Sequence, residues 1–98
     1  MLLHTVSKSP ANNSALDSCL RSLADGAIIL LLEDGVYAAL QGSAWADAIA
    51  DSTEYCYVIM ADAAARGLED KIDRRFPTAG YDDFVRLSTE CHAVQSWY

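Results

Sequence analysis

Three cysteines, Cys19, Cys56 and Cys91, are the residues of this chain with the most distinctive chemistry. A cysteine that accepts and donates sulfane sulfur must ionise to a thiolate that a partner can reach. Cys19 has Arg21 close in sequence, and Lys8 could approach it from the preceding loop, which would favour a thiolate. Cys19 also falls in the apolar stripe of an expected helix, so a buried, inert thiol is the alternative.

The other two thiols are weaker candidates. Cys56 lies inside the aromatic and β-branched run YCYVIM, and we expect it to be buried and inert. Cys91 precedes His92 near the end of the sequence, which favours access, yet it shares a helical face with Phe84 and Leu87. Cys91 is therefore a secondary thiol candidate. An odd number of cysteines argues against a disulfide framework and for reduced thiols.

Metal and phosphate chemistry find little support. A structural zinc site needs about four convergent ligands, commonly in close cysteine pairs, and the sequence has no Cys-x-x-Cys. A phosphate-cradling loop needs several glycines in one turn. Gly35 stands alone after the central apolar run, and Glu33 and Asp34 before it would repel phosphate. We therefore expect no metal and no nucleotide.

The stretch Ala27–Leu40, AIILLLEDGVYAAL, organises the rest of the chain. Its apolar run predicts a central strand over Ile28–Leu32 that is covered on both faces, as in a parallel sheet. Glu33–Gly35 would then form a strand-to-helix turn, with Asp34 capping the first helical amides. Ligands tend to bind at this carboxyl edge of open α/β sheets. Glu33 and Asp34 are either a functional carboxylate pair or a cap and a solvated turn.

The remaining elements alternate between strand and helix. This alternation predicts one α/β domain over residues 1–98, with a central, mostly parallel sheet of four to five strands flanked by helices. Asn12, Asn13 or Ser14 would cap the first helix and Ser43 the second; Asp62 would open the third, and Asp82 or Asp83 would cap the last. The predicted strands are Leu2–Val6, Ile28–Leu32, Tyr55–Met60 and residues 78–81, and the predicted helices are residues 15–24, 44–50, 63–66 and a last one ending near Glu90.

Composition limits the classes of partner. The 98 residues are 52% apolar and 21% charged, which is typical of a globular domain. Fourteen acidic and seven basic residues give a net charge of −7, which argues against direct nucleic-acid binding. No apolar run approaches the roughly 20 residues that span a membrane. The first residues lack a basic, signal-like segment, so we expect a cytoplasmic protein. The terminal Trp97 and Tyr98 are expected to dock on this domain or on a neighbouring chain.

Four stretches resemble the DsrH/TusB family of small sulfur-relay subunits. They are LLHTVSKSP, LLLEDGVYAAL, ARGL at residues 65–68 and YDDFVRLSTECHAVQSW at residues 81–97. The resemblance implies an α/β fold and assembly with DsrE/TusD-type and DsrF/TusC-type subunits into a heterohexamer with two copies of each. It also implies that sulfur passes as cysteine persulfide to a downstream acceptor protein, without a metal or an organic cofactor.

The resemblance leaves two roles open. DsrH-type chains serve sulfur oxidation and carry a cysteine in the first helix, which Cys19 matches, whereas TusB-type chains serve 2-thiolation of the tRNA wobble uridine. This match favours the DsrH branch. Cys19 is then a candidate persulfide carrier; alternatively, the chain is a non-catalytic scaffold that completes the hexamer, because the family's principal persulfide cysteine lies on the DsrE/TusD-type partner. The expected partner-facing surface is the turn Glu33–Tyr37 together with Trp97.

Overall fold

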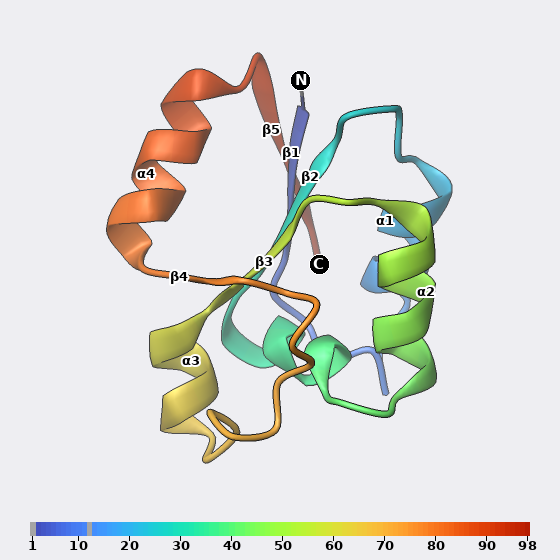
Figure 1. The fold of residues 1–98 in the computed structure, drawn as a ribbon. Coiled ribbons are helices and arrows are strands. Elements are labelled where there is room, and N and C mark those ends of the chain that lie inside the picture. Colours follow the sequence, from blue (N-terminus) through green and yellow to red (C-terminus); the bar gives the residue numbers. More distant parts are fainter. Residues whose placement is uncertain (1, 12) are drawn as a thin grey trace.

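The computed structural model describes residues 2–11 and 13–98, and one five-stranded sheet forms its centre (Figure 1). The strand order is β4-β3-β2-β1-β5, and every pair of neighbours is parallel. The predicted α/β domain with a parallel sheet is therefore confirmed. The strands are β1 (Leu2–Val6), β2 (Ile28–Leu31), β3 (Cys56–Ile59), β4 (Thr78–Ala79) and β5 (Ala93–Trp97).

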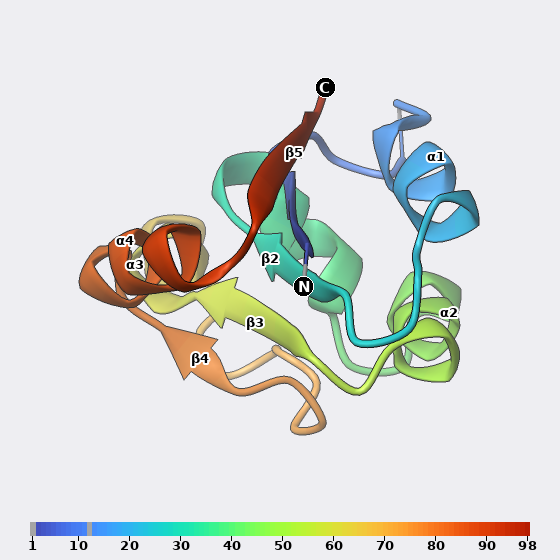
Figure 2. The ribbon, with the colours of Figure 1, turned by 90° about the horizontal axis from the view of Figure 1, so that it is seen from above.

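Helices cover both faces of the sheet, as parallel crossovers require. Figure 2 shows α1 (Ala15–Arg21) and α2 (Ala44–Ser52) on one side, and α3 (Met60–Ala65) and α4 (Tyr81–Glu90) on the other. A 3-10 helix, η1 (Glu33–Ala39), follows β2 at the carboxyl edge of the sheet. Within the described part of the chain, no helix is both long and apolar enough to cross a membrane.

Two apolar clusters lie on opposite faces of the sheet. Ile29 and Leu31 of β2 belong to the cluster that includes Leu16 of α1, and Leu30 belongs to the cluster that includes Leu87 of α4. All four residues of β2 are buried, because both faces of this central strand are covered. The unbroken apolar run that predicted a doubly covered strand is thereby explained.

Several predicted boundaries are wrong at the carboxyl edge. The central strand ends at Leu31, and Leu32 occupies the N-cap position of η1 without a side-chain cap. Asp34 therefore does not cap this helix; it lies inside η1 and binds an arginine, as described below. Strand β3 ends at Ile59, so Met60 begins α3 instead of ending the strand. Asp62 therefore lies within the first turn of α3 and does not open this helix; its carboxylate accepts bonds from Glu33 and Tyr81 instead.

The ends of helices α1 and α2 agree with the prediction at some positions and differ at others. The predicted N-cap Ser43 is confirmed, since its hydroxyl accepts a hydrogen bond from the backbone N–H of Ala46 at 3.1 Å. Helix α1 ends at Arg21 and not at the predicted residue 24. The next residue, Ser22, donates from its hydroxyl to the Ser18 carbonyl at 2.9 Å. Ser14 holds the N-cap position of α1 without a side-chain bond, and Asn12 lies outside the described residues.

Two C-terminal features differ from the prediction. Helix α4 begins at Tyr81 after Gly80, and Asp83 accepts from the Gly80 N–H at 2.8 Å, so Asp83 acts within the first turn and not ahead of it. The last residues, for which no strand was predicted, form β5 along β1, so this end of the chain docks on its own domain.

Candidate functional site

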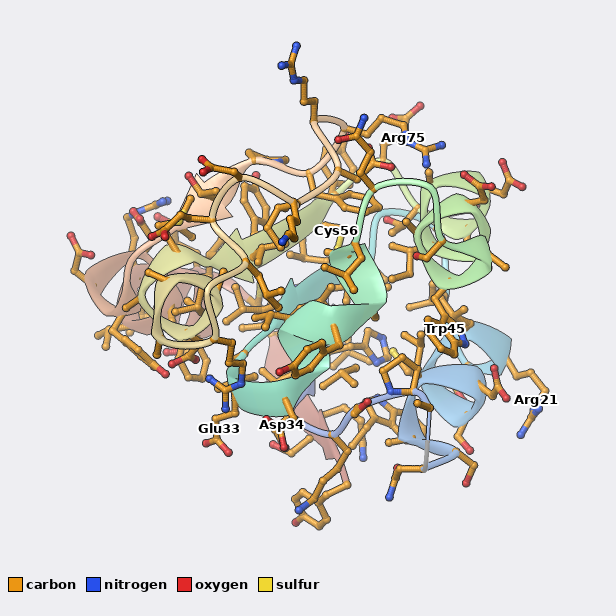
Figure 3. The ribbon with its side chains drawn as sticks, turned by 90° about the horizontal axis from the view of Figure 1, so that it is seen from below. Arg21, Glu33, Asp34, Trp45, Cys56 and Arg75 are labelled. Atoms are coloured by element: carbon orange, nitrogen blue, oxygen red, sulfur yellow. The ribbon has the colours of Figure 1, made fainter. Side chains whose placement is uncertain are left out.

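Helix α1 places the side chain of Cys19 in the core. Cys19 is 0% exposed and shares the inner face of α1 with Leu16. Burial raises the pKa of the Cys19 thiol to about 12, because surroundings of low polarity disfavour the thiolate. Arg21 does not offset this effect; it donates to the Ser18 hydroxyl at 3.5 Å and points away from the core (Figure 3). At neutral pH, Cys19 of this chain is a protonated and enclosed thiol.

The other two cysteines are also buried. Cys56 of β3 is 3% exposed and packs in the same cluster as Cys19. Burial is the main reason that the pKa of the Cys56 thiol lies far above its usual range, and the neighbouring Cys19 raises this pKa further. Cys91 follows α4, is 8% exposed and packs in the cluster on the opposite face. All three thiols are free, and none lies on the surface of this chain.

The carboxyl edge of the sheet carries a distinct polar network, which begins at Glu33. The backbone of Glu33 has a φ of 49°, a left-handed conformation that disfavours residues other than glycine. The Glu33 N–H donates to Oδ2 of Asp62 at 2.7 Å, which holds this conformation from the neighbouring helix α3. Figure 3 shows the Glu33 and Asp34 side chains on the rim of the molecule, directed away from the core.

Asp62 and Arg66 link η1 to α3 and α4. Arg66 donates from Nε to Oδ1 of Asp34 at 2.9 Å, and from its NH1 group to the Asp62 carbonyl at 3.0 Å. The Tyr81 hydroxyl donates to the same Asp62 oxygen as Glu33, at 2.6 Å. This bond to the carboxylate is the main reason that the pKa of Tyr81 rises to about 12. The ends of β2, β3 and β4 are thereby tied together at one edge.

This network carries more negative than positive charge. The network joins three acidic residues, Glu33, Asp34 and Asp62, to one guanidinium, that of Arg66, and it includes no thiol. The Asp34 and Asp62 carboxylates bond to other residues of the chain, whereas the Glu33 carboxylate bonds to none of the residues that the structure describes. An exposed edge with excess negative charge favours a partner with positive charge.

Gly35 holds η1 against the first strand. A Cβ atom at Gly35 would collide with the backbone carbonyl of Val6 at the end of β1. The Leu32 N–H donates to the same carbonyl at 3.2 Å. Only glycine therefore allows η1 to cross this closely over β1.

Tyr37 and Trp97 both contact the domain core. Each is half-buried and packs against the cluster on the α1 and α2 face. Trp97 of β5 donates from Nε1 to Nδ1 of His4 at 3.0 Å, and the two rings stack with centroids 6.1 Å apart. His4 is 1% exposed, as expected for a core residue, and its Nε2 atom is buried without a hydrogen-bond partner.

The structure thus gathers some sequence-predicted residues and separates others. In the register of the sheet, Trp97 lies beside Val6, the residue that also contacts Gly35, so η1 and Trp97 meet at one carboxyl edge. Cys19 lies under α1, and Cys91 precedes the amino end of β5. Sequence reasoning missed Asp62, Arg66 and Tyr81 as parts of the edge. Their signal was position, since Asp62 and Arg66 follow the predicted strand Tyr55–Met60 and Tyr81 ends the predicted strand over residues 78–81.

Away from this edge, the described residues offer neither a metal cluster nor a cavity lined by a thiol. Among residues 2–11 and 13–98, no three His, Cys, Asp or Glu side chains are grouped to hold a metal ion. A cavity of about 440 Å³ opens at the amino end of the sheet, lined by residues 23–26 and 50–55. It lies at the edge opposite η1, and its lining includes none of the three cysteines.

Comparison with known proteins gives a consistent picture. Residues 8–94 match the family model described as DsrH like protein. The chain is 38% identical to Protein TusB of Pectobacterium atrosepticum and 41% identical to Protein TusB of Erwinia tasmaniensis, each over 96 residues. Both alignments cover 98% of this chain and 100% of the relative.

Solved structures share the fold at lower identity. The crystal structure of the ychN protein from E. coli aligns with a TM-score of 0.79 at 14% identity, over 97% of each chain. The solution structure of Tm0979 from Thermotoga maritima aligns with a TM-score of 0.66 at 23% identity, over 92% of this chain and 93% of that one. These likenesses confirm the architecture.

Proposed function

This chain belongs to the DsrH-like family that includes the TusB proteins, and we propose that it is a subunit of a cytoplasmic sulfur-relay complex. Membership over nearly the full length is the observation that carries the proposal. The resemblance of four stretches in this sequence to the DsrH/TusB family implies the chemistry, in which sulfur passes between protein cysteines as persulfide.

Persulfide transfer sets requirements on the cysteines that carry it out. The thiolate of the acceptor attacks the outer sulfur of the donor persulfide, a new S–S bond forms, and the donor leaves as a thiolate. The step needs no external oxidant or reductant, but it needs an ionised thiol that the donor can reach. Cys19, Cys56 and Cys91 are all buried, and burial raises the pKa of Cys19 and Cys56.

The role that fits these thiols is that of a non-catalytic subunit. In this proposal, the carrier cysteine lies on a DsrE/TusD-type subunit, a DsrF/TusC-type subunit completes the complex, and two copies of each form a heterohexamer. This chain contributes binding surface, above all the acidic edge of Glu33 and Asp34 beside Trp97. The curated relatives are named TusB, which weighs toward the tRNA 2-thiolation pathway. With a net charge of −7, the chain itself is not expected to bind the tRNA.

Reconstitution tests this role. The chain is produced together with the DsrE/TusD-type and DsrF/TusC-type subunits of the same organism, and complex formation is measured by size exclusion with light scattering. We expect a stable complex for the parent chain, loss of the complex for Glu33→Lys, and an intact complex for the control Glu54→Lys, an exposed acid at the opposite edge. No complex with the parent chain would refute the role, and an intact complex with Glu33→Lys would refute the acidic edge as its surface.

Cys19 as a persulfide carrier is the second candidate, favoured by its place in the first helix. The purified chain and a Cys19→Ser variant are incubated with sulfide and a persulfide donor and compared by mass spectrometry. A gain of one sulfur, about 32 Da, on the parent alone would establish Cys19 as the carrier. With all three thiols enclosed, we expect no gain on either protein. A gain that survives the substitution would indicate Cys91.

A further inference from the structure

Strand β5 leaves one edge of the sheet open. It pairs with β1 on one side, and it is the last strand in the order β4-β3-β2-β1-β5 (Figure 2). Residues 93–96 are all exposed. On the side away from β1, the described residues provide no strand, so the outward N–H and C=O groups of β5 can bond to an incoming strand.

This edge lacks the devices that normally block such pairing. Proteins protect edge strands with charged residues, proline, bulges or very short strands. The β5 sequence AVQSW has no charge and no proline, and its register with β1 runs unbroken from Ala93 to Trp97. The opposite edge is different, because β4 is only two residues long. Among the described strands, β5 is therefore the edge suited to pairing.

We propose that two copies of this chain pair through the free edges of their β5 strands, antiparallel and centred on Gln95. A two-fold axis at Gln95 places Ala93 opposite Trp97 and Val94 opposite Ser96 of the other copy. Each pair joins a smaller side chain to a larger one, and the two Gln95 amides face each other, so each can donate to and accept from the other.

Charge supports a second copy as the occupant. The chain carries a net charge of −7, which opposes contact between two copies over much of its surface. Residues 93–98 have no acidic or basic side chain, so two β5 edges meet without opposing like charges. Val94 is 42% exposed and Tyr98 82% exposed, and they supply apolar surface beside the seam. The pair is isologous and closes after two copies.

The inference does not depend on the sulfur-relay role, because it needs no other subunit. The full chain is studied alone by sedimentation over a range from low micromolar to submillimolar concentration. The variant Val94→Lys places a charge beside the edge, as natural edge strands do. Its matched control is Val85→Lys, the same change at a site on α4 that is 64% exposed.

We expect dimers for the parent and for Val85→Lys, and a dissociation constant at least about tenfold higher for Val94→Lys. Circular dichroism verifies that both variants are folded. A parent chain that stays monomeric over the whole range would overturn the proposal. Equal dimerisation of the two variants would overturn it as well.

A cross-linking experiment tests the register. Residues directly opposite in an antiparallel pair have Cα atoms about 4.5–5.5 Å apart, which a disulfide can bridge. A Gln95→Cys chain should therefore form a covalent dimer under mild oxidation, whereas Val85→Cys should not. A dimeric sample of Gln95→Cys that fails to cross-link would overturn pairing about Gln95.

Discussion

The bond between Trp97 and His4 predicts that the folded chain loses stability as the pH falls below neutrality. Because Nδ1 of His4 accepts the Trp97 N–H at 3.0 Å, the neutral ring carries its proton on Nε2. A second proton on Nδ1 would break this bond and place a charge in the core, where Nε2 already lacks a partner. Burial accordingly lowers the pKa of His4 below its ordinary value of 6.5.

The sign and size of the effect follow from proton linkage. When the pKa of a histidine is lower in the folded state, the unfolded chain binds the proton first, so the free energy of unfolding falls as pH falls through 6.5. For one proton, the slope cannot exceed about 1.4 kcal/mol per pH unit. The window lies above the range in which carboxylates titrate, and the part of the drop between pH 7 and pH 5.5 that a His4 variant removes is assigned to His4.

Urea unfolding at several pH values measures this effect by circular dichroism at low protein concentration. His4→Asn keeps an acceptor near the position of Nδ1 but cannot take up a proton, so its stability should vary less with pH across this window. The control is Val85→Asn, a change to the same residue at an exposed site of α4 that does not titrate, which should keep the pH dependence of the parent. If the parent and His4→Asn lose stability equally as the pH falls, the reasoning is refuted.

Three further predictions concern the carboxyl edge. Gly35→Ala should lower the free energy of unfolding by about 3 kcal/mol through its collision with β1, whereas Gly42→Ala, in open space with a φ of 83°, should cost only about 1–2 kcal/mol; chemical denaturation compares them. Glu33→Gly should raise stability by about 1 kcal/mol by relieving its left-handed backbone, and an unchanged or lower unfolding midpoint would contradict this. Asp62→Ala should lower the pKa of Tyr81 from about 12 toward its ordinary value of 10.0, seen as an earlier phase in an ultraviolet tyrosine titration; an unchanged titration would remove the hydrogen bond as the cause.

The sequence predicted the elements that depend on local pattern. The apolar run at Ile28 gave a strand buried on both faces, and Ser43 was recognisable as a cap because its hydroxyl bonds within its own helix. Both signals lie within a few residues of the element they define. For that reason they can be recognised without knowledge of the tertiary structure.

The parts that were missed depend on distant residues. Asp34 looked like a helix cap, but its partner is Arg66, which lies 32 positions further along the chain. Asp62 looked like the start of a helix, but it accepts from Glu33, 29 positions before it. Segment 93–97 is largely exposed and alternates weakly, so it gave no strand signal. Its pairing with β1 decides its structure.

The adjacency of β1 and β5 also has a consequence for synthesis of the chain on the ribosome. Thr5 and Ser96, which are hydrogen-bonded across these strands, lie 91 positions apart. Strand β1 is translated early, yet β5, which pairs with its outer edge, leaves the ribosome after all the other described elements. Until then, the edge of β1 that faces away from β2 has no neighbouring strand, and a product truncated before Ala93 would keep it open. Completion of the sheet, and release from chaperones that recognise open strands, is therefore expected to await synthesis of residues 93–97.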